Sequence, residues 1–363
     1  MRAVTDDRGG CGTRRVNLAG GTPAVVIEND LIAATVLPGK GADIYALVSK
    51  RDGIDVLWKS PWGLPSATAG VPSATDSVTA WLEAYEGGWQ EIFPSGGGPC
   101  RYKGVELNFH GEASLAAWEC EVVASEGEAA EILLATRLRR SPFRIVRTMR
   151  VEAGRPVLRF RERITNEGGE PMAAMWGHHP AYGAPFLSSA CRVDTNARLV
   201  RADDELDGPA NRLEPGAEFP WPIGRRGDDV VDLSVVPGPA DPPRQTLAYL
   251  AEFAGDHGWY GITNTDLCLG VGLIWPTAVF PFAWFWQEMH ATPGFPWYRG
   301  AYVMAIEPFS SIPGQGLEKV MAKTGTQIEL AAGEAIEVEF AAVLYHAEAG
   351  IAGIASDGTV SLR

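Results

Sequence analysis

The feature that most constrains this fold is a run of four apolar segments, each with the length and composition of a β-strand. They occupy residues 132–138, 143–151, 157–165 and 172–179. The connectors between them are short and contain Ser-Pro, Ala-Gly-Arg-Pro or Asn-Glu-Gly-Gly, which favour tight turns. Two-residue turns join antiparallel strands, whereas parallel strands need a crossover of a dozen or more residues. The run therefore predicts successive antiparallel hairpins.

The same type of segment recurs along most of the chain. Further strands are expected at residues 25–27, 32–36, 44–48, 246–253, 260–263, 267–274, 301–307 and 336–345. Only residues 80–85 have a weakly helical pattern, and no linker divides the 363 residues. Many strands with few helices predict an all-β protein of two packed antiparallel sheets. We expect residues 1–14 to form a disordered tail and residues 15–363 a single β-sandwich domain.

One uncharged stretch of twenty residues, 267–286, has the length of a membrane span. It contains Pro276 and Pro281, and proline in a helix interior costs about 3 kcal/mol. Two buried strands joined by a turn therefore fit this stretch better than a transmembrane helix.

Charge and cysteine content narrow the partners and the compartment. The formal net charge of −14 disfavours nucleic acids and anionic membranes as partners. The five cysteines are odd in number and form no CxxC pair, which is typical of reduced thiols in a cytoplasmic protein. The first fifteen residues carry early acidic residues and no apolar core, so we predict no secretory signal there.

Four segments place polar residues among aromatic residues or glycines: residues 87–94, 108–113, 176–180 and 305–309. Glu307 follows the apolar run 302–306, where burial would raise its pKa toward the range of a general base. The alternative is a glutamate that reaches solvent at a strand end. His178 and His179 are adjacent on a predicted strand, so their side chains should point to opposite faces.

Other candidate residues have weaker patterns. His110 and Glu112 would share a face of an extended segment, and that spacing could hold a metal, although we expect none. Trp286 and Glu288 follow an aromatic run that suits either a sugar site or a core. Arg159, Arg161 and Arg163 alternate along one strand, interrupted by Glu162, and predict a solvated outer face rather than a phosphate site. Nucleophile-elbow, phosphate-loop and HExxH motifs do not occur.

The ordered combination of these segments resembles the aldose 1-epimerase (galactose mutarotase-like) superfamily. The resemblance rests on Gly-Gly-Trp-Gln-Glu at 87–91, His-Gly-Glu-Ala at 110–113, His-His-Pro at 178–180 and Glu-Pro-Phe at 307–309. Short matches at 26–29, 35–38, 41–44 and 55–59 precede them, and the likeness extends from about residue 25 to residue 345. It implies a large antiparallel β-supersandwich.

The resemblance also implies a reaction, the interconversion of the α and β anomers of a free monosaccharide. A glutamate removes the proton of the C1 hydroxyl while a histidine protonates the ring oxygen, and no cofactor is needed. By motif, Glu307 would be the base and His179, which precedes Pro180, the acid. His110 would bind the sugar, and Gln90, Trp286 and Glu288 are expected by position to do so as well. The arginine and aspartate with which the family binds sugar have no confident match.

Two other function classes stay open. A lyase or glycosidase could use Glu307 with Glu91 or Glu288, and a glycosidase needs carboxyl groups about 5–9.5 Å apart. A non-catalytic sugar-binding protein would keep the aromatic residues without needing Glu307 and His179 on one sugar. The sequence fixes neither the sugar nor the assembly, for which a homodimer is one option.

Overall fold

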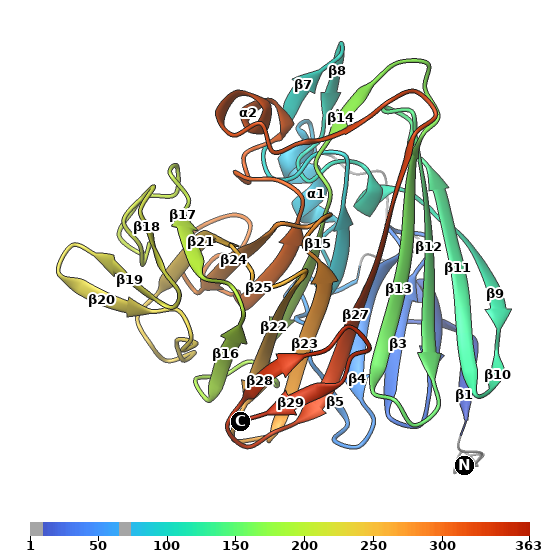
Figure 1. Cartoon of the computed structure of the whole chain (residues 1–363), viewed down its shortest axis with the longest axis horizontal. Helices are drawn as coiled ribbons and strands as arrows, with labels where there is room; N and C mark the ends of the chain where they lie inside the picture. Colours follow the sequence, from blue (N-terminus) through green and yellow to red (C-terminus); the bar gives the residue numbers. More distant parts are fainter. Residues whose placement is uncertain (1–9, 65–73) are drawn as a thin grey trace.

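The structure, a computed structural model, describes residues 10–64 and 74–363, and all statements below refer to these. They form two large antiparallel sheets that pack face to face (Figure 1). The larger sheet has the order β10-β1-β2-β3-β4-β6-β15-β25-β24-β21-β17-β18, with β5 paired to β4. The smaller sheet has the order β16-β22-β23-β27-β13-β12-β11-β9. The fold is therefore the expected all-β, mutarotase-like sandwich.

The strands of the larger sheet are β1 (Cys11–Asn17), β2 (Pro23–Glu28), β3 (Ile32–Leu37), β4 (Asp43–Ser49), β5 (Ile54–Asp55), β6 (Trp89–Ile92), β10 (Glu126–Gly127), β15 (Gly177–Gly183), β17 (Leu199–Ala202), β18 (Glu218–Pro220), β21 (Arg244–Ala251), β24 (Phe282–Met289) and β25 (Tyr302–Phe309). Those of the smaller sheet are β9 (Glu119–Ala124), β11 (Ala129–Arg137), β12 (Phe143–Glu152), β13 (Val157–Asn166), β16 (Cys191–Thr195), β22 (His257–Asn264), β23 (Leu269–Pro276) and β27 (Ala335–His346).

The remaining elements are small and lie around these sheets. They are the pairs β7 (Cys100–Tyr102) with β8 (Val105–Leu107), β14 (Met172–Ala174) with β26 (Ile328–Leu330), β19 (Ile223–Arg226) with β20 (Asp229–Asp232) and β28 (Ile351–Ile354) with β29 (Val360–Leu362), and the helices α1 (Ser77–Glu83) and α2 (Leu317–Lys323). Both helices and the β7–β8 hairpin gather at one end of the sandwich (Figure 1). This end carries the site described below.

Alternation along the strands accounts for the core between the sheets. On β12, Phe143, Ile145, Met149 and Val151 are buried and alternate with more exposed residues. Side chains of successive strand residues point to opposite faces, so one face of each strand enters the core. The larger sheet buries a second apolar cluster on its other face, beneath α1 and α2. Two buried faces make its central strands apolar almost throughout.

Several expectations can now be compared with the structure. The uncharged stretch forms β23 and β24, and the weakly helical segment lies in and beside α1. The arginines of β13 face outward, where Arg161 and Arg163 pair with Glu337 of β27. The expected tail of residues 1–14 was too long, because Gly12 to Arg14 pair with β2 inside β1, and Cys11 and Gly12 pair with β10; residues 1–9 lie outside the described part. Within that part, no helix combines the length and apolar character of a membrane span.

Candidate functional site

A row of five side chains crosses the outer face of the larger sheet, from β24 to β4. The register places Trp284 opposite Glu307, and the pairs Ala181–Ala305 and Gly177–Phe309 place His179 opposite Glu307 on the other side. His179 in turn lies opposite Gln90, and the Ile44–Trp89 pair puts Asp43 next in line. Directly opposed residues of paired strands point to the same face. Residues distant in sequence are thus brought side by side.

Glu307 and His179 lie at the centre of this row. Their closest atoms, Oε1 and Nε2, are 3.7 Å apart, and the side chains are 2% and 6% exposed. Burial raises the pKa of Glu307 well above its ordinary value, and burial lowers the pKa of His179 to about 4. Because a buried group avoids charge, the pair favours a protonated carboxyl beside a neutral imidazole.

His110 reaches the same place from a loop. It has a φ of +55°, and the following Gly111, with φ of +74°, comes so close to β6 that a Cβ there would lie 2.3 Å from the carbonyl oxygen of Phe93. The backbone N–H of Gly97 donates to His110 Nδ1 at 3.1 Å. Burial, followed by the nearby His179, lowers the pKa of His110 well below its ordinary value. The ring is therefore neutral with its proton on Nε2, a single donor beside His179.

This turn also separates His110 from Glu112, so the two do not form the extended H-x-E pair considered from spacing. The Glu112 carboxylate accepts hydrogen bonds from the backbone N–H groups of Arg139 and Arg140 and from the Ser141 hydroxyl. The Glu112 carboxylate therefore binds the loop between β11 and β12 of the smaller sheet.

Helix α1 and the residue just after its C-cap supply two aromatic residues, Trp81 and Tyr85, that the sequence had not singled out as functional. Asp76 caps the helix by accepting from the N–H of Thr79, which fixes its start. Trp81 stacks on Tyr85, and its ring centre lies 4.6 Å from that of His110. Tyr85 makes an edge contact with His179 at 5.8 Å. The weak helical pattern at 80–85 contained both residues, but nothing in it indicated that they would pack beside His110 and His179.

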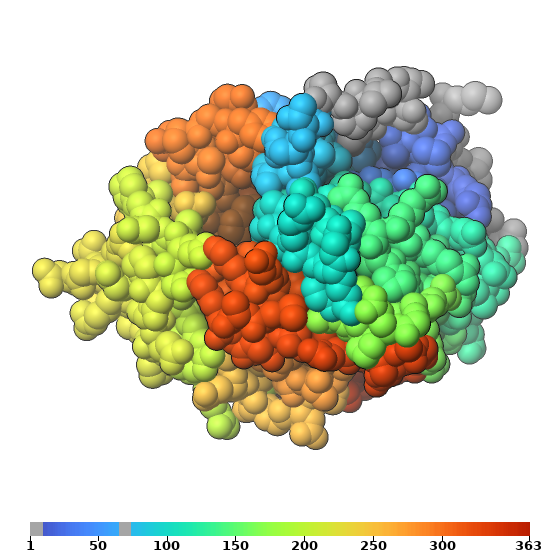
Figure 2. Space-filling model, turned by 90° about the horizontal axis from the view of Figure 1, so that it is seen from above, coloured from blue at the N-terminus to red at the C-terminus, as the bar shows by residue number. Residues whose placement is uncertain are grey.

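The third side of the site is the loop 290–301 between β24 and β25. Trp297 of this loop packs edge-on against Trp58 and Tyr85. Trp286 is half-buried, with its ring centre 5.5 Å from that of His179. Figure 2 shows a recess on this face between the orange segment that includes this loop and the blue segment that carries α1. Ala305 and Ala181 follow Trp286 in the next row of the sheet, and their small side chains leave space above the sheet at the bottom of the recess.

Gln90, one of the expected sugar contacts, lies on this face and is fully buried. Its Nε2 donates to Asp43 Oδ2 at 3.2 Å and to the carbonyl oxygen of Gly87 at 2.6 Å. Gly88 has a φ of +81°, and a Cβ there would lie 2.5 Å from the carbonyl oxygen of Ile44. Gly88 thus lets β6 approach β4 closely enough for Gln90 to reach Asp43.

Glu288, another expected sugar contact, shares this face but has a different environment. Its Oε1 accepts from the N–H groups of Ala291 and Thr292, and its Oε2 accepts from the Thr292 hydroxyl. The carboxylate therefore anchors the start of loop 290–301, and we leave it out of the substrate contacts.

The opposite face of β15 and β6 carries a buried charge network that the sequence had only hinted at. Arg147 donates to Glu91 and Glu162, and Nε2 of His178 lies 3.1 Å from Glu162 Oε2. Trp176 Nε1 donates to the other oxygen of Glu91. Burial, followed by the neighbouring Glu162, raises the pKa of Glu91 to about 7. Arg147 and Glu162 occupy inward positions of the alternating strands β12 and β13. These inward positions were the feature of the sequence from which a buried ion pair could have been predicted.

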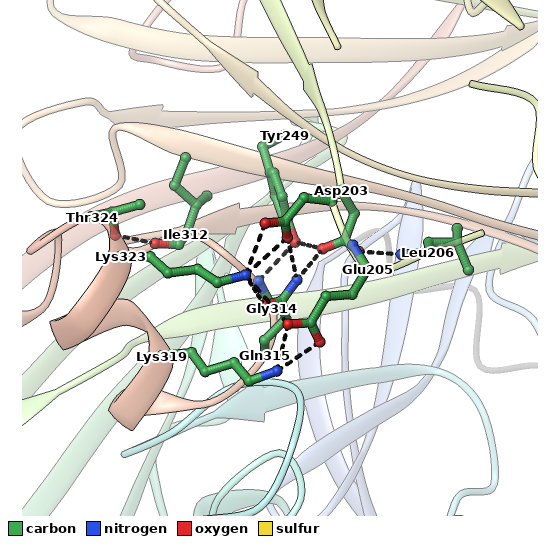
Figure 3. Close-up of polar contacts among 11 residues, drawn as sticks. Asp203, Glu205, Leu206, Tyr249, Ile312, Gly314, Gln315, Lys319, Lys323 and Thr324 are labelled. Carbon is green, nitrogen blue, oxygen red and sulfur yellow. Dashed lines mark hydrogen bonds and ion pairs between the residues drawn. The ribbon is translucent and has the colours of Figure 1, made fainter. Parts of the chain in front are cut away.

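At the far rim of the recess, a second polar cluster joins the loop 203–206 to α2 (Figure 3). Asp203 Oδ2 accepts from the Tyr249 hydroxyl and from Gln315 Nε2, and Oδ1 accepts from the N–H groups of Glu205 and Leu206. Every oxygen of this buried carboxylate is thus used by protein donors. The cluster holds the rim together and has no free acceptor side chain at its centre.

Known structures share this architecture at low sequence identity. A Klebsiella pneumoniae protein provisionally named an aldose 1-epimerase is 16% identical, with a TM-score of 0.70 over 99% of this chain and 91% of that one. A galactose mutarotase-like protein of Clostridium acetobutylicum is 13% identical, with a TM-score of 0.64 over 93% and 100%. An Escherichia coli protein, also provisionally named an aldose 1-epimerase, is 16% identical, with a TM-score of 0.57 over 92% and 100%. These likenesses confirm the fold.

No curated protein matches the chain in sequence. A family model covers residues 19–344, which is most of the chain, and its description is "Domain of unknown function (DUF4432)". The chain therefore belongs to the DUF4432 family and has the galactose mutarotase-like fold.

Proposed function

We propose that this protein is an aldose 1-epimerase-like enzyme that interconverts the anomers of a free monosaccharide. The observation that carries the proposal is the buried pair Glu307 and His179, 3.7 Å apart, at the floor of an aromatic recess. The half-buried Trp286 offers a flat face to the C–H groups of a sugar ring, Trp81 and Tyr85 pack beside His110 and His179, and His110 offers one N–H donor. The likeness of the fold to mutarotase-like proteins supports the same reaction.

The reaction requires that Glu307 and His179 together hold one proton, which moves between them by way of the substrate. Ring opening begins with Glu307 as carboxylate and His179 as imidazolium: the C1 hydroxyl gives its proton to Glu307, the bond from C1 to the ring oxygen breaks, and His179 protonates that oxygen. The product is the open-chain aldehyde with protonated Glu307 and neutral His179, which is the form that burial favours. Rotation about the C1–C2 bond and reversal of both transfers yield the other anomer.

The alternative of a glycosidase with a second carboxylate fits the geometry less well. Glu91 points to the other face of the sheet, where Arg147 and Trp176 hold it. Glu288 lies four residues along β24 from Trp284, the residue opposite Glu307. Four strand residues span roughly 13 Å, beyond the 5–9.5 Å that glycoside hydrolysis uses. A single carboxylate beside a histidine favours ring opening.

The test is anomer exchange measured by NMR on a panel of free aldoses, with the spontaneous rate subtracted. We expect wild-type protein to accelerate exchange for at least one sugar and Glu307→Gln to lose about 10²–10⁴-fold in rate. Thermal unfolding of Glu307→Gln should match wild type, because the amide replaces a carboxyl of the same shape that burial keeps neutral. Exchange at the wild-type rate in the variant would remove Glu307 from the mechanism.

A further inference from the structure

Beyond the catalytic pair, the recess has a second group of buried polar atoms without protein partners. Among the described residues, no hydrogen-bond partner exists for Asp43 Oδ1, Glu86 Oε1, Gln90 Oε1 and the Tyr85 hydroxyl. Their side chains are 0–2% exposed. A buried polar atom without a partner costs about 1–3 kcal/mol, so four in one place indicate that something else satisfies them.

These atoms belong to one connected cluster. Lys40 Nζ contacts Asp43 and lies 2.9 Å from Glu86 Oε2, so a single ammonium group bridges the two carboxylates. Gln90 donates to the same Asp43 and keeps its carbonyl oxygen free. Burial opposes the charge on Lys40, but Asp43 and Glu86 hold its pKa above its ordinary value.

The cluster adjoins the catalytic pair. Asp43 and Gln90 continue the row that contains His179 and Glu307, and Asp43 lies two strands from His179, about 10 Å between backbones. Burial, followed by the charges of Glu307, Glu86 and Asp43, raises the pKa of the Tyr85 hydroxyl well above its ordinary value. This hydroxyl is therefore near enough to Glu307 and to the two carboxylates to feel their charges.

We propose that Asp43, Glu86, Gln90 and Tyr85, with Lys40 as their counter-ion, form a subsite that binds non-reacting hydroxyl groups of a neutral polyhydroxylated substrate. This proposal rests on the proposed function for the identity of the reacting end. Hydroxyl groups both donate and accept, so they match two carboxylate acceptors, an amide oxygen and a phenol together.

Charged groups fit the subsite less well. The Lys40 ammonium already occupies the position between the carboxylates that a cation would take. A phosphate or carboxylate would meet Asp43 and Glu86 in a buried setting, where like charges repel strongly. The subsite therefore selects neutral sugars over uronic acids and phosphorylated sugars.

The experiment separates binding from turnover by using 1,5-anhydrohexitols as probes. These sugars keep the ring oxygen and the hydroxyls at C2, C3, C4 and C6 but lack the C1 hydroxyl, so they cannot open. Affinities for 1,5-anhydroglucitol, 1,5-anhydrogalactitol and 1,5-anhydromannitol are measured by ligand-observed NMR titration. Anomer exchange is measured in parallel on the free aldoses.

The informative variant is Tyr85→Phe, which removes one hydroxyl that no described protein group contacts. We expect affinity for the bound anhydrohexitol to fall about 3- to 10-fold while the melting temperature stays level or rises. Asp43→Asn should weaken binding about 10-fold or more. The matched control is Tyr182→Phe, on the other face of β15, whose hydroxyl bonds to that of Tyr260 at 2.6 Å. It should lower the melting temperature and keep affinity.

The outcomes distinguish the two proposals. Loss of binding in Tyr85→Phe and Asp43→Asn without any anomer exchange in wild type would keep the subsite and refute the proposed reaction. Unchanged affinity in both variants would overturn the subsite even if exchange is fast. Failure of all three anhydrohexitols to bind, or tighter binding of glucose 6-phosphate than of glucose, would also overturn it.

Discussion

Each face of strand β15 buries one histidine, but the two histidines have different surroundings. On the inner face, His178 lies 3.1 Å from Glu162, within a network in which Arg147 joins Glu162 to Glu91. On the outer face, His179 faces Glu307, and among the described residues no arginine or lysine pairs with that carboxylate. One face holds compensated charge, and the other holds groups that are ready to exchange a proton.

The difference shows that burial alone does not identify a catalytic group. Arg147 and Glu307 are both 2% exposed, yet Arg147 donates to three acceptors, Glu91, Glu162 and the carbonyl oxygen of Ala42. A compensated buried charge ties two sheets together, whereas an uncompensated carboxyl carries a raised pKa and a free acceptor. The presence of ion-pair and hydrogen-bond partners, rather than the degree of burial, is what distinguishes Arg147 from Glu307.

The largest effect should follow from breaking the inner network. Arg147→Met removes the only cation shared by Glu91 and Glu162 in the described network, and leaving buried carboxylates unpaired costs about 3–5 kcal/mol. We expect urea unfolding to show this loss or the variant to fail to fold. Arg161→Met, on the solvent face of β13 beside Glu337, should stay within about 0.5 kcal/mol of wild type. Equal effects of the two substitutions would contradict the structural role of the network.

The next contrast separates the two histidines directly. His179→Asn should lower the rate of anomer exchange about 10²–10⁴-fold with little change in melting temperature, because it removes one of two proton-transfer groups. His178→Asn should do the reverse and cost about 1–3 kcal/mol of stability, since Glu162 Oε2 loses its contact. If His178→Asn alone abolished exchange, the outer face would not be the catalytic one.

The pH dependence of exchange should follow the proton count of the outer pair. Burial lowers the pKa of His179 to about 4 and raises that of Glu307, so the singly protonated pair persists from the raised pKa of Glu307 down to about pH 4. Below about pH 4 both groups carry protons, and kcat/KM should fall about tenfold per unit. On the alkaline side, the rate should fall only above the raised pKa of Glu307. A decline that begins near pH 6.5, as for an exposed histidine, would contradict this environment for His179.

Much of the fold could be predicted from the sequence because hairpins are local. Turn residues and alternation between 132 and 165 specify neighbouring strands, and β11 to β13 pair in chain order. The fourth segment, 172–179, was wrongly expected to continue these hairpins: β13 pairs with β27, and β15 joins the larger sheet between β6 and β25. Adjacent positions diverge on any strand, so the opposite orientations of His178 and His179 were also predictable. The motif order located Glu307, but its register opposite His179 depends on pairing between strands about 130 residues apart, which a single sequence does not encode locally.

The parts that were missed depend on contacts that cross the sheet. Trp81 comes from the two-turn helix α1 and Tyr85 from the segment just after it, and tertiary packing decides how this segment docks. Lys40 and Asp43 belong to a turn and strand start whose importance appears only when Gln90 is seen beside them. Arg147, in contrast, sat at an inward position of a regular strand, and a buried arginine there predicts an acidic partner.

The smallest effect is expected at Glu288, which shares the outer face with Glu307 but has protein hydrogen-bond partners for both carboxylate oxygens. A substitution there tests most directly whether such partners distinguish structural from functional carboxylates. Its carboxylate accepts from Ala291, from both the backbone and the hydroxyl of Thr292, and so anchors the loop that carries Trp297. Glu288→Gln keeps the shape but weakens charge-assisted bonds, at a cost of about 1 kcal/mol.

Trp297 packs on Trp58 and Tyr85, so a loosened loop reaches the site only through that contact. We therefore expect Glu288→Gln to raise KM a few-fold, leave kcat unchanged and lower the melting temperature slightly. Steady-state kinetics and thermal unfolding on the same preparation check this split. If Glu288→Gln lost as much kcat as Glu307→Gln and kept wild-type stability, Glu288 would be a catalytic residue in spite of its hydrogen bonds to residues 291 and 292. The presence of protein partners would then not distinguish structural from functional carboxylates on this face.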